Sequence, residues 1–91
     1  GINAIEEESF LNHSMQLNEG DTVYIFSDGY VDQFGGPEDK KFKYGPFKDL
    51  LIGISGKKME TQREKLDRVI EEWKGDRPQV DDILIFGIRF L

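Results

Sequence analysis

Two apolar stretches rich in β-branched and aromatic residues constrain the fold of this 91-residue chain most strongly. Residues 23–26, VYIF, are continuously apolar, which suits a central strand covered on both faces. Residues 83–90, ILIFGIRF, predict a final strand. If the two strands are antiparallel neighbours, the end of the first meets the beginning of the second at one edge of the sheet.

The segments around these strands predict two helices and one further strand. Residues 13–17 alternate and precede turn residues, which indicates a hairpin with the strand at 23–26. A short helix is expected from Pro46 to about residue 54, and a longer one from Met59 to a stop at Gly75. The apolar face of this longer helix is expected to pack in the core and consists of Leu66, Val69, Ile70 and Trp73.

The order strand, strand, helix, helix, strand predicts an α/β (α+β) fold, an antiparallel sheet with two helices. Residues 1–12 are expected to form an irregular lead-in, and residues 35–45 a loop with a charged surface. No linker, repeat or low-complexity tract divides the chain, so we interpret residues 1–91 as a single domain or one piece of a domain.

Composition excludes several function classes. The formal net charge of −6 makes nucleic acid an unlikely partner, because like charges repel. The absence of cysteine excludes disulfides and thiolate metal sites and fits a reducing compartment, so we expect a cytoplasmic location. No apolar stretch approaches the ~20 residues that a membrane span requires, so we expect that the piece is not inserted in a membrane.

Aspartates border both apolar stretches where they would meet. Asp28 follows the first stretch, and Asp81 and Asp82 precede the second. Carboxylates this close repel each other, and either a hard divalent cation or a strongly raised pKa compensates. Oxygen ligands suit Mg²⁺ or Mn²⁺, and Gly29 is consistent with a backbone held tightly beside such an ion. The alternative is an ordinary turn at Asp28 and Gly29, with the later pair merely starting a strand.

The segments LNEGDTVYIFSDGYVDQF and DDILIFGIRF, with helices between them, resemble the C-terminal half of a metal-dependent serine/threonine phosphatase of the PPM family. The similarity is greatest to its bacterial sporulation stage II protein E (SpoIIE-like) branch. It implies part of an αββα sandwich, with Asp28 and Asp81 as metal ligands and Asp32 as a weaker candidate for an accessory metal. The family uses two Mn²⁺ or Mg²⁺ ions to activate a water molecule that attacks a phosphoserine or phosphothreonine.

Two features depart from the family pattern. Nothing in the chain occupies the place of the upstream Asp-Gly motif, whose aspartate bridges the two metals, and Leu84 stands where a small hydroxyl residue is usual. We therefore expect a fragment of a bacterial signalling protein, the output part of a two-component-type sensor or regulator that acts on a phosphorylated regulatory protein. The parent could be anchored in a membrane, and the fragment alone is expected to be inactive.

The alternative function is a non-catalytic interaction module that keeps the phosphatase fold and forms a homodimer. A truncated sheet would expose an edge and an apolar surface that favour docking. His13 is interpreted as an ordinary strand or turn residue. The lysines of the charged loop could attract a phosphorylated partner, but a solvated surface is the simpler interpretation.

Overall fold

The computed structural model describes residue 11, residues 13–17 and residues 21–90. Along the chain, the strands and helices are β1 (His13–Leu17), β2 (Thr22–Phe26), β3 (Phe34–Gly35), β4 (Lys40–Lys41), α2 (Tyr44–Ile54), α3 (Met59–Lys74) and β5 (Ile85–Arg89). The predicted order is confirmed, with the short β3 and β4 added. The lead-in expected at residues 1–12 lies outside the described residues, apart from Leu11.

The strands form a three-stranded antiparallel sheet in the order β1-β2-β5, with β2 in the centre. Phe26 pairs with His13 on one side and with Ile85 on the other, so the predicted pairing of the two apolar strands is confirmed. The last strand is shorter than residues 83–90, because residues 83 and 84 form the approach to it.

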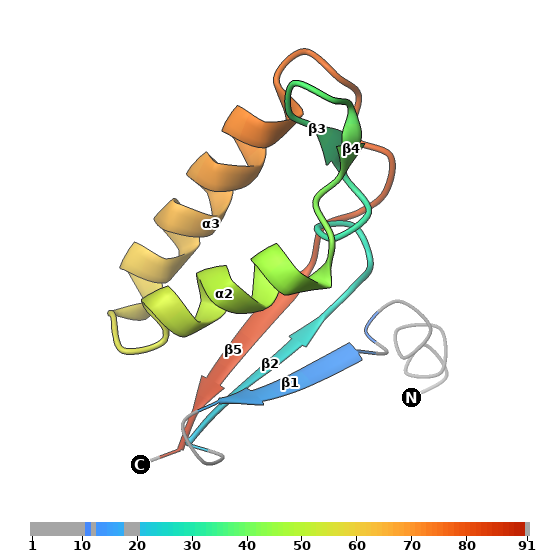
Figure 1. Cartoon of the computed structure of the whole chain (residues 1–91). Helices are drawn as coiled ribbons and strands as arrows, with labels where there is room; N and C mark the ends of the chain where they lie inside the picture. The colour runs from blue at the N-terminus through green and yellow to red at the C-terminus, as the bar shows by residue number, and fades with distance from the viewer. Residues whose placement is uncertain (1–10, 12, 18–20, 91) are drawn as a thin grey trace.

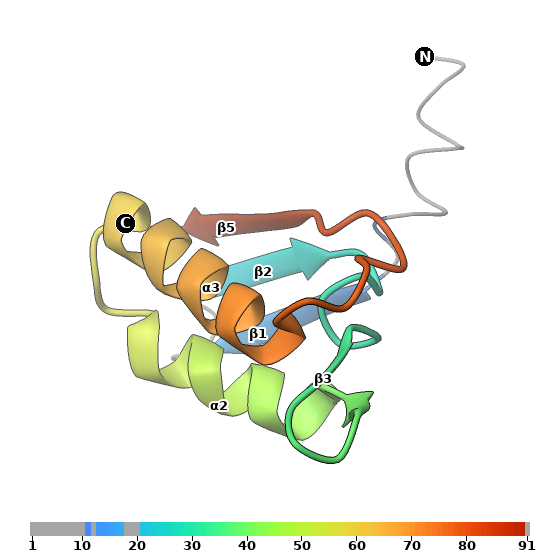
Figure 2. The same ribbon diagram turned by 90° about the horizontal axis from the view of Figure 1, so that it is seen from above.

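Both helices lie on the same face of the sheet (Figures 1 and 2). Helix α3 begins at Met59 and ends before Gly75, whose φ of 58° suits a residue without Cβ. Helix α2 begins at Tyr44, two residues before the expected start at Pro46. Proline is tolerated there because the first turn of a helix has no partners for its N–H groups. No helix of the described residues is long and apolar enough to span a membrane.

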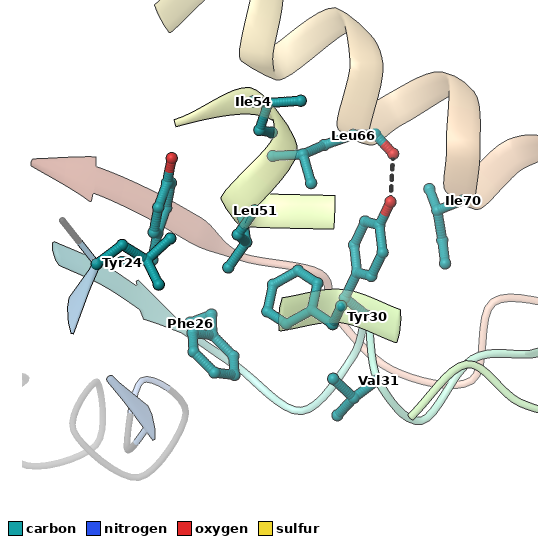
Figure 3. Packing of buried hydrophobic residues seen from close by; sticks show 10 residues of the cluster. Tyr24, Phe26, Tyr30, Val31, Leu51, Ile54, Leu66 and Ile70 are labelled. Atoms are coloured by element: carbon teal, nitrogen blue, oxygen red, sulfur yellow. Dashed lines mark hydrogen bonds between the residues drawn. The ribbon is translucent and has the colours of Figure 1, made fainter. Parts of the chain in front are cut away.

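The core lies between this sheet face and the two helices (Figure 3). Tyr24 and Tyr30 are almost fully buried, and each hydroxyl has a partner. Tyr24 donates to Oε1 of Gln62 at 2.6 Å, and Tyr30 donates to the carbonyl of Leu66 at 2.7 Å. These two bonds tie the sheet and the turn after β2 to α3, because a buried hydroxyl without a partner is costly.

Residues 35–45 are not entirely loop, because β3 and β4 pair as a small antiparallel ladder. Trp73 fixes this ladder to the end of α3: its ring Nε1 donates to the carbonyl of Gln33 at 2.9 Å, and its own carbonyl accepts from the N–H of Gly36 at 2.9 Å. A Cβ on Gly36 would approach the indole ring to 2.6 Å, and its φ of 72° also favours glycine. Trp73 therefore packs as predicted, and its partner is a glycine-containing turn.

The other face of the sheet is apolar and is not covered by the helices. Val23 pairs with Ile88 and Ile25 with Phe86, and we call these four residues the outer sheet face. Side chains alternate along a strand, so they point away from Tyr24 and Phe26, which are in the core. Phe86 and Ile88 are 53% and 41% exposed, respectively. Among the described residues, β2 is thus covered fully on one face, not on both as its composition predicted.

Candidate metal centre

The end of β2 is joined to the approach to β5 through Ser27. Its N–H donates to the carbonyl of Leu84 at 2.9 Å, and its hydroxyl accepts from the N–H of Leu84 at 3.0 Å. The same hydroxyl donates to the carbonyl of Asp82 at 2.8 Å. Ser27 is only 3% exposed, so these bonds fix the relative position of the Asp28 and Asp82 segments in a largely dry environment.

Gly29 lies directly against this junction. A Cβ built on Gly29 would lie 2.2 Å from the carbonyl oxygen of Asp82, far closer than atoms of this kind approach. The glycine is thus required by close packing of two backbones and not by a positive φ. Gly29 therefore packs against the second carboxylate-bearing segment.

The carboxylate of Asp28 is held by two donors from distant parts of the fold. Oδ1 accepts from the hydroxyl of Tyr44, the first residue of α2, at 3.3 Å. The same oxygen contacts Nε2 of His13, the first residue of β1. Partial desolvation of the hydroxyl and, secondarily, the negative charge of Asp28 raise the pKa of Tyr44 above its ordinary value, so the hydroxyl stays protonated further into the alkaline range.

Asp81 and Asp82 are exposed and begin the approach to β5. Oδ1 of Asp81 accepts from the N–H of Asp82 at 2.8 Å, which orients its side chain along the turn. Gln79 donates to the carbonyl of Asp81 at 3.0 Å. The structure thus brings the Asp28 segment and the Asp81–Asp82 segment together through their backbones, as the antiparallel pairing predicts.

Asp32 lies one turn beyond Asp28. Its N–H donates to the carbonyl of Asp28 at 2.9 Å, so the two residues belong to one local turn. One of its carboxylate oxygens lies 3.5 Å from Nζ of Lys41 on β4, an ion pair with both side chains about half exposed. This position beside Asp28 is compatible with the expected accessory role, while the lysine is a competing partner.

The fold and these motifs agree with the comparisons to known proteins. The family model described as stage II sporulation protein E (SpoIIE) matches residues 2–91. The chain belongs to the stage II sporulation protein E family. Its fold is similar to a solved structure, the SiaA-PP2C domain of Pseudomonas aeruginosa, with a TM-score of 0.73 and 35% identity. The alignment covers 76% of this chain and 28% of that chain. The comparison with curated proteins gave no match.

Membership of this family confirms the resemblance to a metal-dependent phosphatase domain. The similar solved structure confirms the α+β fold class. The chain spans little more than a quarter of the length of the SiaA-PP2C structure. The described residues supply one helical layer and one sheet of the expected αββα sandwich. The outer sheet face is the surface on which a second sheet packs in such a sandwich.

The donor chemistry of this family member fits Mn²⁺ or Mg²⁺, since Asp28, Asp32 and Asp81 offer only hard oxygen ligands. Within the described ranges, however, no three acidic or histidine side chains converge on one point that could hold an ion. The donor chemistry therefore suits a hard divalent ion, but the described residues alone do not assemble a complete metal site.

Two residues of the site were not found from the sequence. His13 is interpreted from the sequence as an ordinary strand or turn residue, and Tyr44 is not among the candidate residues, yet both reach the Asp28 carboxylate. The hairpin register contains a signal for His13, because it pairs with Phe26, two residues before Asp28. Nothing in the spacing of Tyr44 indicates its contact with β1.

Proposed function

We propose that this chain contributes one part of the metal centre of a protein phosphatase that hydrolyses phosphoserine or phosphothreonine. Asp28 and Asp81 are the proposed metal ligands, Asp32 is an accessory ligand, and Gly29 lets the two ligand segments approach each other. The hydrogen bonds of Ser27 to Asp82 and Leu84 carry this proposal, because they hold together two motifs that are far apart in the sequence.

When bound, Mn²⁺ or Mg²⁺ supplies Lewis-acid activation of water and neutralises negative charge on the phosphoryl group. The residues of this chain hold oxygen ligands at one end of the sheet. The half-exposed side chain of Asp28 and the exposed Asp81 leave room for a phosphorylated side chain. The bridging ligand that the family requires has no counterpart in the sequence, so the chain alone is expected to be inactive.

The proposed substrate is a phosphorylated regulatory protein in the cytoplasm, and the proposed role is the output of a bacterial two-component-type sensor or regulator. The family membership supports this role. The lack of cysteine fits a reducing compartment, and the net charge of −6 argues against nucleic acid as a partner.

The test is Mn²⁺-dependent release of phosphate from phosphoserine and phosphothreonine peptides by the longest natural chain that contains these residues. Asp28→Asn and Asp81→Asn should each lower turnover at least 100-fold, because each removes a charged ligand from the metal. Asp76→Asn, an aspartate in the connector after α3, is the matched control and should retain full turnover. Undiminished turnover in Asp28→Asn would refute the proposed ligand role.

The outer sheet face favours a second candidate function, an interaction or dimerisation module that keeps the phosphatase fold. Phe86 and Ile88 stand exposed side by side with the half-buried Val23 and Ile25, and such apolar surfaces are commonly covered by protein. Sedimentation velocity of the 91-residue chain over a range of concentrations tests it. Self-association that Phe86→Ser weakens would support this module, whereas a monomer at all concentrations would oppose the homodimer.

A further inference from the structure

His13, Asp28 and Tyr44 form a compact polar cluster at the end of the sheet, which we call the Asp28 cluster. The three residues come from β1, the turn after β2 and the start of α2, respectively. The Tyr44 hydroxyl lies 3.3 Å from Oδ1 of Asp28 and 3.2 Å from Nε2 of His13, so each side chain contacts the other two. Two residues that are distant in sequence therefore converge on a single carboxylate.

Both contacts of the Asp28 side chain are made by the same oxygen. Tyr44 and His13 each reach Oδ1, while no side chain or backbone group of residues 13–17 and 21–90 makes a hydrogen bond or ion pair with Oδ2. The Asp28 side chain is 45% exposed, so the carboxylate can be reached from solvent. A carboxylate with one oxygen held by donors can still bind a cation through its other oxygen.

The aromatic core fixes the positions of the two donors. The His13 ring stacks on Phe26 with centroids 5.5 Å apart and an interplanar angle of 25°. Tyr44 packs edge-on against the same imidazole at 5.6 Å, and Phe26 in turn packs on Phe47 of α2 at 4.9 Å. Phe26 is almost fully buried, so it gives both donors a rigid support. An exposed ion pair between flexible side chains would have no such support.

We propose that His13 and Tyr44 are positioning residues that hold the Asp28 carboxylate in the orientation in which it would bind Mn²⁺ or Mg²⁺. This inference rests on the proposed function and adds two residues to it. The donors act through Asp28 and not on the metal or the substrate. Hydrogen bonds to a ligating carboxylate restrict its rotation, and loss of such bonds typically lowers metal affinity by 10- to 100-fold.

The experiment is calorimetric titration with MnCl₂ of the longest natural chain that contains these residues, with a thermal melt of each variant without metal. Tyr44→Phe removes one hydroxyl and keeps the ring packing on His13. We expect its Kd for Mn²⁺ to rise about tenfold, with a melting temperature close to that of the unchanged protein. His13→Ala should also raise the Kd, and His13→Gln, which retains an N–H donor, should recover part of the affinity.

Tyr24→Phe is the matched control, because it also removes a hydroxyl but one in the core, bonded to Gln62. It should lower the melting temperature and leave the Kd unchanged, which separates stability from positioning. Asp28→Asn separates the positioning role of His13 and Tyr44 from the metal-ligand role of Asp28 on which it rests. If Asp28→Asn abolishes binding and both Tyr44→Phe and His13→Ala bind normally, the positioning role is overturned and the metal site stands. If Asp28→Asn also binds normally, or the unchanged protein binds no Mn²⁺, both are overturned.

Discussion

The hydroxyl of Ser27 lies 2.8 Å from the carbonyl oxygen of Asp82, across 55 positions of sequence. This bond joins the end of the central strand to the beginning of the last one. Two acidic motifs that are distant in the sequence, at Asp28 and at Asp81–Asp82, thereby become neighbours. The pairing of β2 with β5 determines their approach, and Ser27 extends the contact past the last ladder pair, Phe26 with Ile85.

Removal of the Ser27 hydroxyl should destabilise the domain. Ser27→Ala leaves the N–H of Leu84 without its side-chain acceptor in a largely dry environment, which costs about 1–3 kcal/mol of unfolding free energy. Urea denaturation followed by circular dichroism measures the change. Ser14→Ala, in the exposed part of β1, is the control and should stay within about 0.5 kcal/mol of the unchanged protein. Equal losses for both serines would contradict a structural role for the bridge.

Two glycine substitutions should change stability in opposite directions. Gly29→Ala places a methyl group 2.2 Å from the Asp82 carbonyl, so the two segments must separate, at a cost of about 1–3 kcal/mol. Gly53→Ala lies within α2, where a Cβ has no neighbour within 4 Å. There the added methyl group should stabilise the protein by up to about 1 kcal/mol, because alanine favours helix. Thermal melts of both variants provide the measurement, and a tolerated Gly29→Ala would disprove the close approach.

The stability of the domain should fall above about pH 10, the ordinary tyrosine pKa. Burial and, secondarily, the charge of Asp67 raise the pKa of Tyr30 in the folded state. Burial also raises that of Tyr24, although Arg89 opposes the shift. Unfolded tyrosines therefore lose protons that the folded protein keeps, which favours unfolding by up to about 1.4 kcal/mol per pH unit for each tyrosine.

Denaturation at pH 8 and pH 11 tests this dependence. The free energy of unfolding should fall less between pH 8 and pH 11 in Tyr30→Phe, because one tyrosine no longer contributes. The variant should also be less stable at pH 8, because it lacks the bond to Leu66. Exposed Tyr44→Phe is the comparison variant and should reduce the alkaline loss less. An alkaline loss of the same size in Tyr30→Phe would show that this hydroxyl does not control it.

The sequence was sufficient to predict the main fold because its signals are local or periodic. Continuous β-branched and aromatic residues identified β2, and Met59 and Gly75 bounded the long helix correctly. The start of α2 was predicted two residues late, because Pro46 suits more than one position in a first turn. The β3–β4 ladder was missed because its strands are two residues each and depend on contact with Trp73.

The candidate site was predicted only in part. Asp28 and Asp81 could be brought together from strand pairing alone, because antiparallel neighbours share an edge. The contacts of His13 and Tyr44 with Asp28 could not be predicted, since they require the angle at which α2 crosses the end of β1. Ser27 lies within the first segment that resembles the family, but the two bonds of its hydroxyl depend on the backbone of the later segment.

The most direct measurement of the proposed metal centre is an NMR titration of the ¹⁵N-labelled chain with substoichiometric Mn²⁺, which broadens the signals nearest to the bound ion. We expect the amide signals of residues 27–29 and 81–83 to broaden together, and those of Thr22 and Arg89, which pair at the other end of the sheet, to broaden least. Asp28→Asn should remove this selectivity. Broadening spread evenly over the acidic surface, unchanged by Asp28→Asn, would contradict a metal centre built from these two segments.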